Sequence, residues 1–303
     1  MHSVKNRLLA KFSVFIGLLM GARVFIAVLL IFALYVSTFF LFNQEETLRE
    51  FVFDFKVHAI ILCSFLSILA GGIINQFYDK EKDQITKPFR TKLQNFIAQK
   101  HYLYLYLILN TLSLGIAASM SFRIFIFFLI YQFMMWFYSH KLSKMLIVNN
   151  LSFVGLSLYP FFGMLVYYQT FSMHILLMSV YLFSILISID ITKDILTKNA
   201  DRIFGYQTIA NSFSTTVSRR VTSLILLLNI GVTIGIICLK EVHNIMKLYF
   251  EIGLFIQIIT LILLLKSQKY YSFTVINLLR LWVFVGIISM LVDGIVTYLR
   301  LSH

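Results

Sequence analysis

Apolar runs of about twenty residues recur along the whole chain, separated by short polar stretches. A run of this length crosses the hydrocarbon core of a bilayer as an α-helix, because a helix satisfies its own backbone hydrogen bonds. The pattern predicts an all-α integral membrane protein with about nine transmembrane helices. Their approximate bounds are 14–42, 57–77, 101–120, 123–139, 150–168, 172–190, 221–239, 247–265 and 273–298.

No segment rich in Pro, Gly or Ser separates these spans, so we expect a single domain over residues 1–303. The first apolar run is longer than the core of a signal peptide and lacks a convincing cleavage site, so we interpret it as a retained span. Cys63 and Cys238 both lie in apolar runs. We expect both to be small buried hydrophobic side chains without a disulfide.

Composition excludes a soluble protein, because 59% of the residues are hydrophobic and the mean hydropathy is +0.86. The net charge of +13 is compatible with several kinds of partner. In a chain this apolar, basic residues set the orientation and meet anionic lipid head groups or a phosphorylated substrate. We expect the lipid bilayer to be a partner, and no nucleic acid.

The distribution of Lys and Arg predicts the orientation. The N-terminus and the loops after spans two, four, six and eight carry 18 of these residues, and the other side carries 6. The N-terminus is therefore predicted to be cytoplasmic and the C-terminus outside, in a bacterial inner membrane. Arg23 and Arg280 fall within spans, and an Arg ten residues inside an apolar run should face the protein interior. Asp293 and Arg280 lie 13 residues apart in the last span and stay unassigned, with interhelical pairing favoured.

The stretch GGIINQFYDKEKDQITKPFR begins as the end of the second span and runs into a polar, basic loop. Asn75, Asp79 and Asp83 are four residues apart, and each such step turns a helix only about 40° past a full circle. The three oxygen-bearing side chains therefore share one helix face. Carboxylates at a membrane edge are costly unless they bind something positive, and hard oxygen ligands suit Mg²⁺.

A second stretch, SIDITKDILTKNADRIFGYQT, ends the sixth span and carries Asp190, Asp194 and Asp201. If the helix continued, these three carboxylates would again lie within a narrow arc. Six of the chain's 13 acidic residues sit in these two stretches, so random placement of charge is a poor account of them. Two such faces could clamp a diphosphate between magnesium ions.

These motifs resemble those of the UbiA superfamily of intramembrane prenyltransferases, which includes UbiA-type terpene cyclases. Asn75, Asp79 and Asp83 match the family's first motif, and the adjoining KPFR is similar to its K-P-x-R. KDILTKNADRIFGYQT is similar to KDxxDxxGDxxxGxxT, and YSHKLSKMLIVNN resembles Y-S-x-x-L-K-R…G-N through Lys144 and Asn150 among others. The resemblance implies a helical bundle with a central cavity that opens to the cytoplasmic side.

The resemblance also implies the chemistry. The carboxylates and Asn75 would hold Mg²⁺ ions that bridge a prenyl diphosphate and ease the breaking of its allylic C–O bond. The expected catalytic residues and metal ligands are Asn75, Asp79, Asp83, Asp190, Asp194 and Asp201. Basic side chains suit phosphate oxygens, and the expected diphosphate contacts are Arg23, Lys87, Arg90, Lys144 and Lys193.

An allylic cation needs a dry pocket with aromatic faces, each of which stabilises a cation by roughly 0.5–2 kcal/mol. The candidates are Phe77, Tyr78, Tyr131, Trp136, Tyr138, Tyr159 and Phe183, although most aromatic residues of such a chain pack or line the interface.

Several positions depart from the family pattern. Gln76 stands where a second acidic residue is usual, Thr197 replaces the middle Asp of the second motif, and Ala200 replaces a Gly. Arg23 is followed by Ile26 where the family often has R-x-x-N, and Ser143 stands for a Lys. The first expectation is transfer of the prenyl group to an aromatic or lipid acceptor. Ile26 and Thr197 favour the alternative of a cyclase without a second substrate, and a transporter is a minor third alternative.

Overall fold

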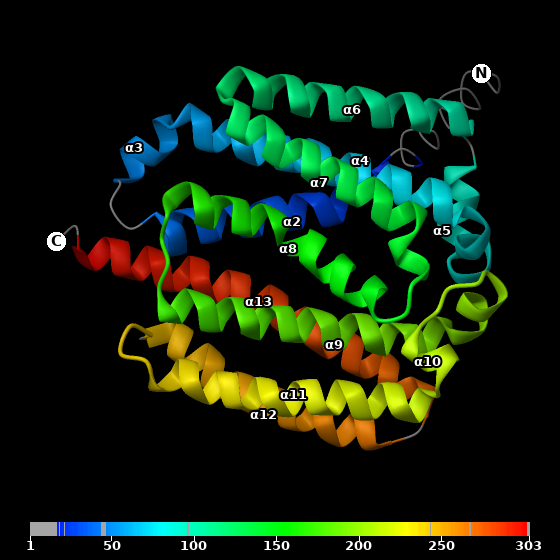
Figure 1. Cartoon of the computed structure of the whole chain (residues 1–303). Helices are drawn as coiled ribbons and strands as arrows, with labels where there is room; N and C mark the ends of the chain where they lie inside the picture. Colours follow the sequence, from blue (N-terminus) through cyan, green and yellow to red (C-terminus); the bar gives the residue numbers. More distant parts are fainter. Residues whose placement is uncertain are drawn as a thin grey trace, which may run out of the picture. The chain divides into compact units, whose positions relative to one another are not determined.

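The computed structural model describes residues 17, 19–20, 22–43, 47–95, 97–242, 244–266 and 268–301, and Figure 1 traces their helices along the chain. Nine of the helices in these ranges are long and apolar enough to cross a membrane, so this is a multi-pass membrane protein. The nine-span prediction is confirmed for the described part of the chain. The helical contacts form two compact units, residues 1–35 with 46–142 and residues 36–45 with 143–303. The expectation of one domain stays a prediction.

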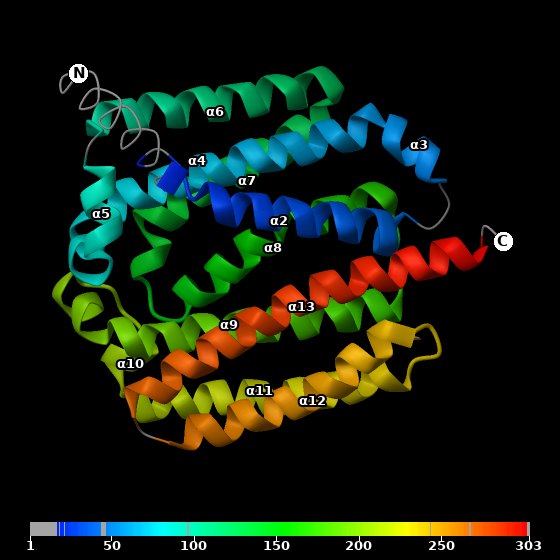
Figure 2. The same ribbon diagram turned by 180° about the vertical axis from the view of Figure 1, so that it is seen from behind.

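The first unit contains most of α2 (Val24–Ser37), the short α3 (Leu48–Phe53), α4 (Phe55–Thr86), α5 (Pro88–Gln94), α6 (Gln99–Met120) and α7 (Phe122–His140). Helix α4 packs against both α6 and α7, and Figures 1 and 2 show α4 and α6 running beside each other. A buried polar contact joins the three helices, because Gln132 donates to the Ser67 hydroxyl at 3.2 Å and Ser67 lies 3.1 Å from the Ser113 hydroxyl. Small hydroxyl residues of this kind allow close packing of helices in lipid.

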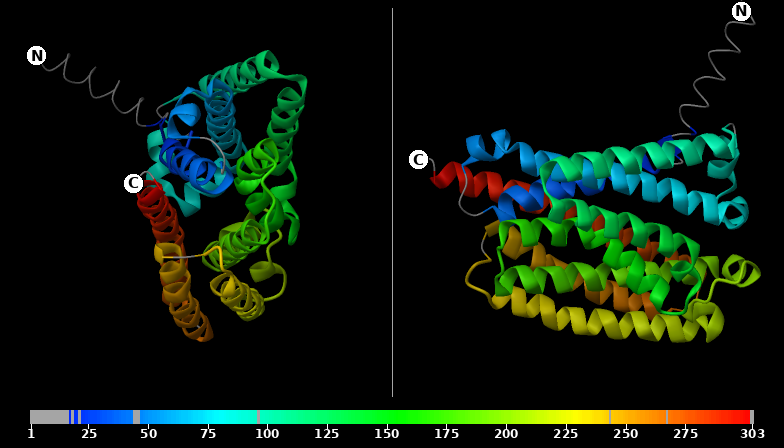
Figure 3. Two further views of the ribbon diagram at one scale, coloured as in Figure 1. Left: turned by 90° about the vertical axis from the view of Figure 1, so that its left-hand side faces the viewer. Right: turned by 45° about the horizontal axis from the view of Figure 1, so that its top comes forward.

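The second unit contains the π-helical η1 (Thr38–Phe42), α8 (Val148–Tyr168), α9 (Met173–Ile203), α10 (Ile209–Ser212), α11 (Thr215–Cys238), α12 (Asn244–Leu265) and α13 (Lys269–Leu301). A short 3₁₀ turn, η2 (Leu142–Lys144), begins at the end of the first unit. Helices α9, α11, α12 and α13 enclose the main core of the second unit. In Figure 3 the yellow α11 and the orange α12 run beside each other. Trp282 stacks on Tyr249 with ring centroids 4.6 Å apart and donates to the Tyr181 hydroxyl at 2.9 Å.

Two charged side chains, Asp293 and Arg219, make hydrogen bonds to the backbone at the two ends of α12. Asp293 on α13 accepts the backbone N–H of Ile245 at 2.9 Å and that of Met246 at 3.4 Å, so it caps the start of α12. We expected Asp293 to pair with another helix, and it does so through hydrogen bonds to the backbone of α12. Arg280 is exposed and has no ion pair in the described residues. At the other end, the buried Arg219 donates to the carbonyl oxygens of Lys266 and Gln268 just after α12.

Removal of the Arg219 guanidinium should destabilise the second unit. Arg219→Met removes the charged donor of the Lys266 and Gln268 carbonyl oxygens and of the buried Ser272 hydroxyl, which costs about 1.5–3 kcal/mol of unfolding free energy. Thermal unfolding of the purified protein in detergent measures the loss. Arg220→Met is the matched control, because Arg220 is the next residue of α11 and is exposed. An equal effect of the two substitutions would contradict the capping role of Arg219.

Three sequence predictions need correction. The spans that carry the acidic motifs are longer than predicted: α4 continues to Thr86 and α9 to Ile203, where the predicted bounds were 77 and 190. Polar residues continue a helix until a breaker stops it, and the breakers here are Pro88 and Gly205. Cys63 is fully buried as expected, but Cys238 is exposed at the end of α11, so the prediction of burial is wrong for it.

Candidate functional site

Helix α4 presents the first motif as a continuous helical face. The Asn75 amide donates to the Asp79 carboxylate, with Nδ2 and Oδ2 2.6 Å apart. Both side chains are half-buried, so this carboxylate remains accessible to a ligand. The four-residue spacing therefore produces the shared face that the sequence predicted.

Asp83 lies one turn further along the helix and has different partners. It is 3% exposed, accepts from the Lys87 ammonium at 2.8 Å and from the Thr86 hydroxyl at 3.4 Å through Oδ1. Its second oxygen, Oδ2, is buried and has no hydrogen-bond partner in the described part of the chain. Such an orphaned acceptor is costly unless a donor or cation reaches it.

We expected Arg23 to lie ten residues inside a span that begins at residue 14, but residues 14–16 are outside the described part of the chain. Among the described residues, Arg23 directly precedes α2, which begins at Val24. Arg23 has a positive φ of 52°, which interrupts a right-handed helix at that residue. The turn lies against α4: a Cβ on Gly72 would meet the Ala22 carbonyl oxygen at 2.8 Å, so only glycine permits this approach. Arg23 is thereby placed beside the first motif at the described end of the span.

Positive charge gathers where α4 ends. Burial lowers the pKa of the Lys87 ammonium, although Asp83 opposes the shift. Burial also lowers the pKa of Arg90, and Arg23 adds to both shifts through its own positive charge. Arg90 is held in place because its guanidinium donates to the Met20 carbonyl at 2.9 Å. Arg23, Lys87 and Arg90 repel one another, and Asp79 and Asp83 act on them as the nearby negative charges. This arrangement favours the binding of an anion together with its metal.

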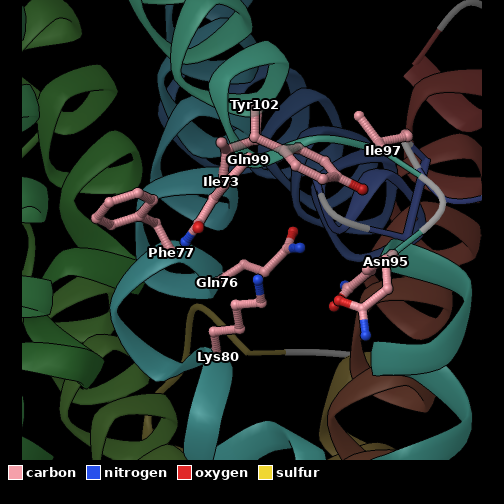
Figure 4. A pocket seen from close by; sticks show the side chains of 9 residues that line it. Ile73, Gln76, Phe77, Lys80, Asn95, Ile97, Gln99 and Tyr102 are labelled. Carbon is pink, nitrogen blue, oxygen red and sulfur yellow. The ribbon is translucent and has the colours of Figure 1, made fainter.

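Gln76, the family's usual acidic position, belongs to a separate small cavity. The cavity measures about 20 Å³, which is room for roughly one water molecule. Figure 4 shows Gln76 among Lys80, Asn95 and Tyr102, which come from α4, the residues after α5, and α6. The Gln76 oxygen is buried there without a hydrogen-bond partner in the described chain. The Gln76 amide therefore lines this cavity, whereas the Asn75 amide bonds Asp79.

Helix α9 holds the second motif within one continuous helix to Ile203. Asp190, Asp194 and Asp201 are all buried, with no more than 4% of any of them exposed. Asn150, on α8, donates its amide to Asp190 at 2.8 Å and to Asp194 at 3.0 Å. One amide group therefore fixes two carboxylates that come from successive turns of α9.

Lys193 lies between the same two carboxylates. Its ammonium makes an ion pair with Asp190 and lies 3.8 Å from an oxygen of Asp194. The ammonium is also 5.3 Å from the centre of the Phe153 ring, within reach of a cation–π contact. Its charge offsets one of the two buried negative charges.

Thr197 and the end of α9 complete this cluster. The Thr197 hydroxyl donates to Asp201 at 2.7 Å, so the residue that replaces the family's middle Asp supports a neighbouring carboxylate instead. Gly205 has a φ of 72°, a left-handed conformation that ends α9 and that other residues rarely adopt.

Lys144 joins the third motif to this helix end. The Lys144 carbonyl accepts the backbone N–H of Gln207 at 3.1 Å, and its ammonium lies 5.5 Å from the centre of the Tyr206 ring. Two stretches far apart in sequence, YSHKLSKMLIVNN and KDILTKNADRIFGYQT, thus meet at both Lys144 and Asn150.

The oxygen atoms of both motifs fit a magnesium ion. No three acidic, His or Cys side chains in the described ranges lie close enough to form a complete metal site alone. Mg²⁺ does not need one, because it is usually bound by one or two carboxylates, waters and substrate phosphates. Asp83 Oδ2 in the first unit and Asn150 Oδ1 in the second are buried oxygens without a hydrogen-bond partner in the described residues. Both are hard oxygen ligands, which suit this cation.

The seven aromatic candidates fall in both units. Phe77, Tyr78, Tyr131, Trp136 and Tyr138 belong to the first unit and Tyr159 and Phe183 to the second. Tyr131 is 2% exposed, Phe77 lines the small cavity with Gln76, and Trp136 stacks on His140 at 5.4 Å. Their role beside a cation stays a prediction.

Asn150 is the residue that sequence reasoning left out of the site. It belongs to the third motif, but nothing in the spacing connects it to carboxylates 40 and 44 residues later. Asn150 matches the last residue of the family's Y-S-x-x-L-K-R…G-N motif, and this match could have marked it as a site residue.

Three solved structures show how this fold compares with known proteins. A structure described as digeranylgeranylglyceryl phosphate synthase in membranes has a TM-score of 0.72 and 18% identity, over 93% of this chain and 99% of that one. A UbiA homologue from Archaeoglobus fulgidus bound to DMAPP and Mg²⁺ has a TM-score of 0.62 and 14% identity, over 91% and 99%. The apo UbiA homologue from Aeropyrum pernix K1 has a TM-score of 0.67 and 13% identity, over 89% and 97%.

Sequence comparison identifies the family. No curated protein sequence matches this chain. The sequence profile of the UbiA prenyltransferase family matches residues 30–272, which is most of the chain and includes both acidic motifs. The fold of the similar structures agrees with this match. The chain belongs to the UbiA prenyltransferase family.

Proposed function

We propose that this protein is a magnesium-dependent prenyltransferase that ionises a polyprenyl diphosphate within the membrane and transfers the prenyl group to an aromatic or lipid acceptor. The observation that carries the proposal is the pairing of carboxylates with an Asn amide and a Lys ammonium in each unit. Relatives of the same fold support it, since the Archaeoglobus fulgidus homologue was solved with DMAPP and with GPP, each with Mg²⁺.

The acidic residues of the site are proposed to bind magnesium, and the basic residues to bind the diphosphate. Asn75, Asp79 and Asp83 in the first unit and Asp190, Asp194 and Asp201 in the second are the proposed magnesium ligands, with Asn150 holding two of them. Bound Mg²⁺ supplies Lewis-acid neutralisation of the diphosphate oxygens. Arg23, Lys87, Arg90, Lys144 and Lys193 are the proposed phosphate contacts.

The chemistry begins when the allylic C–O bond breaks. Its electron pair leaves with the diphosphate, where the basic side chains stabilise the added negative charge. The allylic cation then accepts an electron pair from the acceptor to form the new bond, and an aromatic or hydroxyl acceptor loses one proton. Aromatic side chains protect the cation from water until that bond forms.

A cyclase is the second candidate. In that reaction a double bond of the same prenyl chain supplies the electron pair, so no acceptor is needed. The apolar Ile26 favours it, because this side chain is 50% exposed at the position where the family often has a polar Asn. Thr197 favours it less now that its hydroxyl is seen to support Asp201.

Product analysis separates the two reactions. The purified protein is incubated with geranyl, farnesyl or geranylgeranyl diphosphate and Mg²⁺, with and without aromatic and lipid-alcohol acceptors, and products are read by mass spectrometry. A transferase forms product only with an acceptor, and Ile26→Asn should change acceptor use. A cyclic hydrocarbon or alcohol formed from one diphosphate alone, at a rate that acceptors do not change, would instead establish the cyclase. In that case Ile26→Asn should divert product to linear or monocyclic compounds.

The orientation follows from charge and is part of the proposal. The N-terminus would be cytoplasmic and the C-terminus outside, in a bacterial inner membrane, with both acidic motifs at the cytoplasmic ends of their helices. Phosphorylated metabolites are found on that side.

A further inference from the structure

Lys193 lies where a cation bound by the second motif would lie. Its ammonium contacts Asp190 and is 3.8 Å from Asp194, and both carboxylates are buried. The Asn150 amide donates to the other oxygen of each carboxylate, which orients the two groups toward a shared position. The Asn150 oxygen is buried without a hydrogen-bond partner in the described chain. The Oδ1 atoms of the two carboxylates form a cation-binding pair, and Lys193 supplies its present cation.

The Lys193 side chain is the longer and more exposed partner in its ion pair. Lys193 is 39% exposed, and its ammonium is carried on a flexible stem with four methylene groups, whereas Asp190 and Asp194 are held on the helix by Asn150. Mg²⁺ and the ammonium would compete for the same two Oδ1 atoms, because the repulsion between like charges grows as the distance falls.

We propose that Lys193 is a resident cation that Mg²⁺ displaces from Asp190 and Asp194, and that the freed ammonium then binds the substrate diphosphate. This rests on the proposed function, and it goes beyond a phosphate contact because it makes the lysine a competitor of the metal. The buried carboxylates thus always have a positive partner, either the lysine or the metal. Metal and diphosphate bind cooperatively, since the diphosphate gives the displaced ammonium a new partner.

Loss of the ammonium has opposite effects on two binding reactions. Lys193→Met removes the competitor, so a divalent cation alone should bind more tightly, by about tenfold or more. The same variant lacks one phosphate contact, so diphosphate in the presence of Mg²⁺ should bind about tenfold more weakly. A residue that only supports the fold would weaken both.

The experiment uses the full chain in nanodiscs with Mn²⁺ as a spectroscopic substitute for Mg²⁺. Bound Mn²⁺ is measured by electron paramagnetic resonance without any diphosphate, and inorganic diphosphate binding is measured separately in saturating Mg²⁺. Lys198→Met is the matched control, because it removes the same charge five residues later on α9, where no ion pair is present in the described chain. Lys193→Arg keeps a cation and should bind Mn²⁺ as the unaltered protein does. Thermal unfolding confirms that each variant is folded, and Lys193→Gln replaces Lys193→Met if the latter is not.

Weaker or unchanged Mn²⁺ binding in folded Lys193→Met would overturn the displacement, and so would an equal increase in Lys198→Met. Asp194→Asn separates this failure from failure of the proposed function. If Asp194→Asn abolishes Mn²⁺ binding but Lys193→Met does not tighten it, the metal site stands and only the displacement is wrong. If the unaltered protein binds neither Mn²⁺ nor diphosphate, both are wrong.

Discussion

Asp194→Asn should abolish magnesium-dependent cleavage of prenyl diphosphates, with a loss of about 10²–10³-fold or more. Asp194 is 4% exposed, accepts from the Asn150 amide at 3.0 Å and lies 3.8 Å from the Lys193 ammonium. Asparagine keeps the volume of the side chain and removes its negative charge. The metal then loses a charged ligand, and the leaving diphosphate loses the electrostatic support that depends on that metal.

The fold should survive this substitution. Asp190 remains as the ion-pair partner of Lys193, so the buried pair becomes neutral instead of leaving a charge without a partner. Release of inorganic diphosphate measures the first step for both the transferase and the cyclase. Glu251→Gln is the control, because it makes the same change of charge on an exposed face of α12 in the same unit. Cleavage by Asp194→Asn at more than a tenth of the normal rate in saturating Mg²⁺ would contradict the role of this carboxylate.

Hydrophobic pattern predicted the membrane spans well because length and apolarity decide which helices cross a bilayer. It placed the ends of α4 and α9 too early, since hydropathy falls at the first polar turn whereas the helix continues. These helices end at Thr86 and Ile203 because Lys87 precedes a proline and Gly205 takes a left-handed conformation. Pro88 and Gly205 are both visible in the sequence. The helix ends should have been placed at these two residues and not where the hydropathy falls.

Partners that lie far apart in the chain could not be predicted in this way. The four-residue spacing placed Asn75 and Asp79 on one face, and the structure joins them at 2.6 Å. Spacing says nothing of how Asp293 caps α12, or of how the turn at Arg23 lies against Gly72. Those contacts depend on the packing of whole helices, which periodicity within one helix does not determine.

Asn150 shows the same limit within the candidate site. Its amide bonds both Asp190 and Asp194, while its own oxygen is buried without a hydrogen-bond partner in the described residues. The side chain therefore acts on the carboxylates directly, as the hydrogen-bond donor that they share. Groups that orient metal ligands are often as necessary as the ligands, and their loss typically costs 10–100-fold in metal affinity or activity.

Asn150→Ala should therefore weaken metal binding by about 10–100-fold while the chain still folds. The two carboxylates lose their shared donor, so they repel each other more strongly and turn away from a common cation, and Lys193 can neutralise only one of them. Mn²⁺ binding without substrate measures the affinity of the metal site directly. Thermal unfolding measures stability, and the free energy of unfolding should fall by about 1–3 kcal/mol because buried hydrogen bonds are lost. Asn199→Ala is the control, because Asn199 is an exposed asparagine on α9, the helix that carries both carboxylates. If Asn150→Ala binds Mn²⁺ within twofold of normal while Asp194→Asn does not bind it, Asn150 is a packing residue and the two carboxylates are oriented by α9 alone.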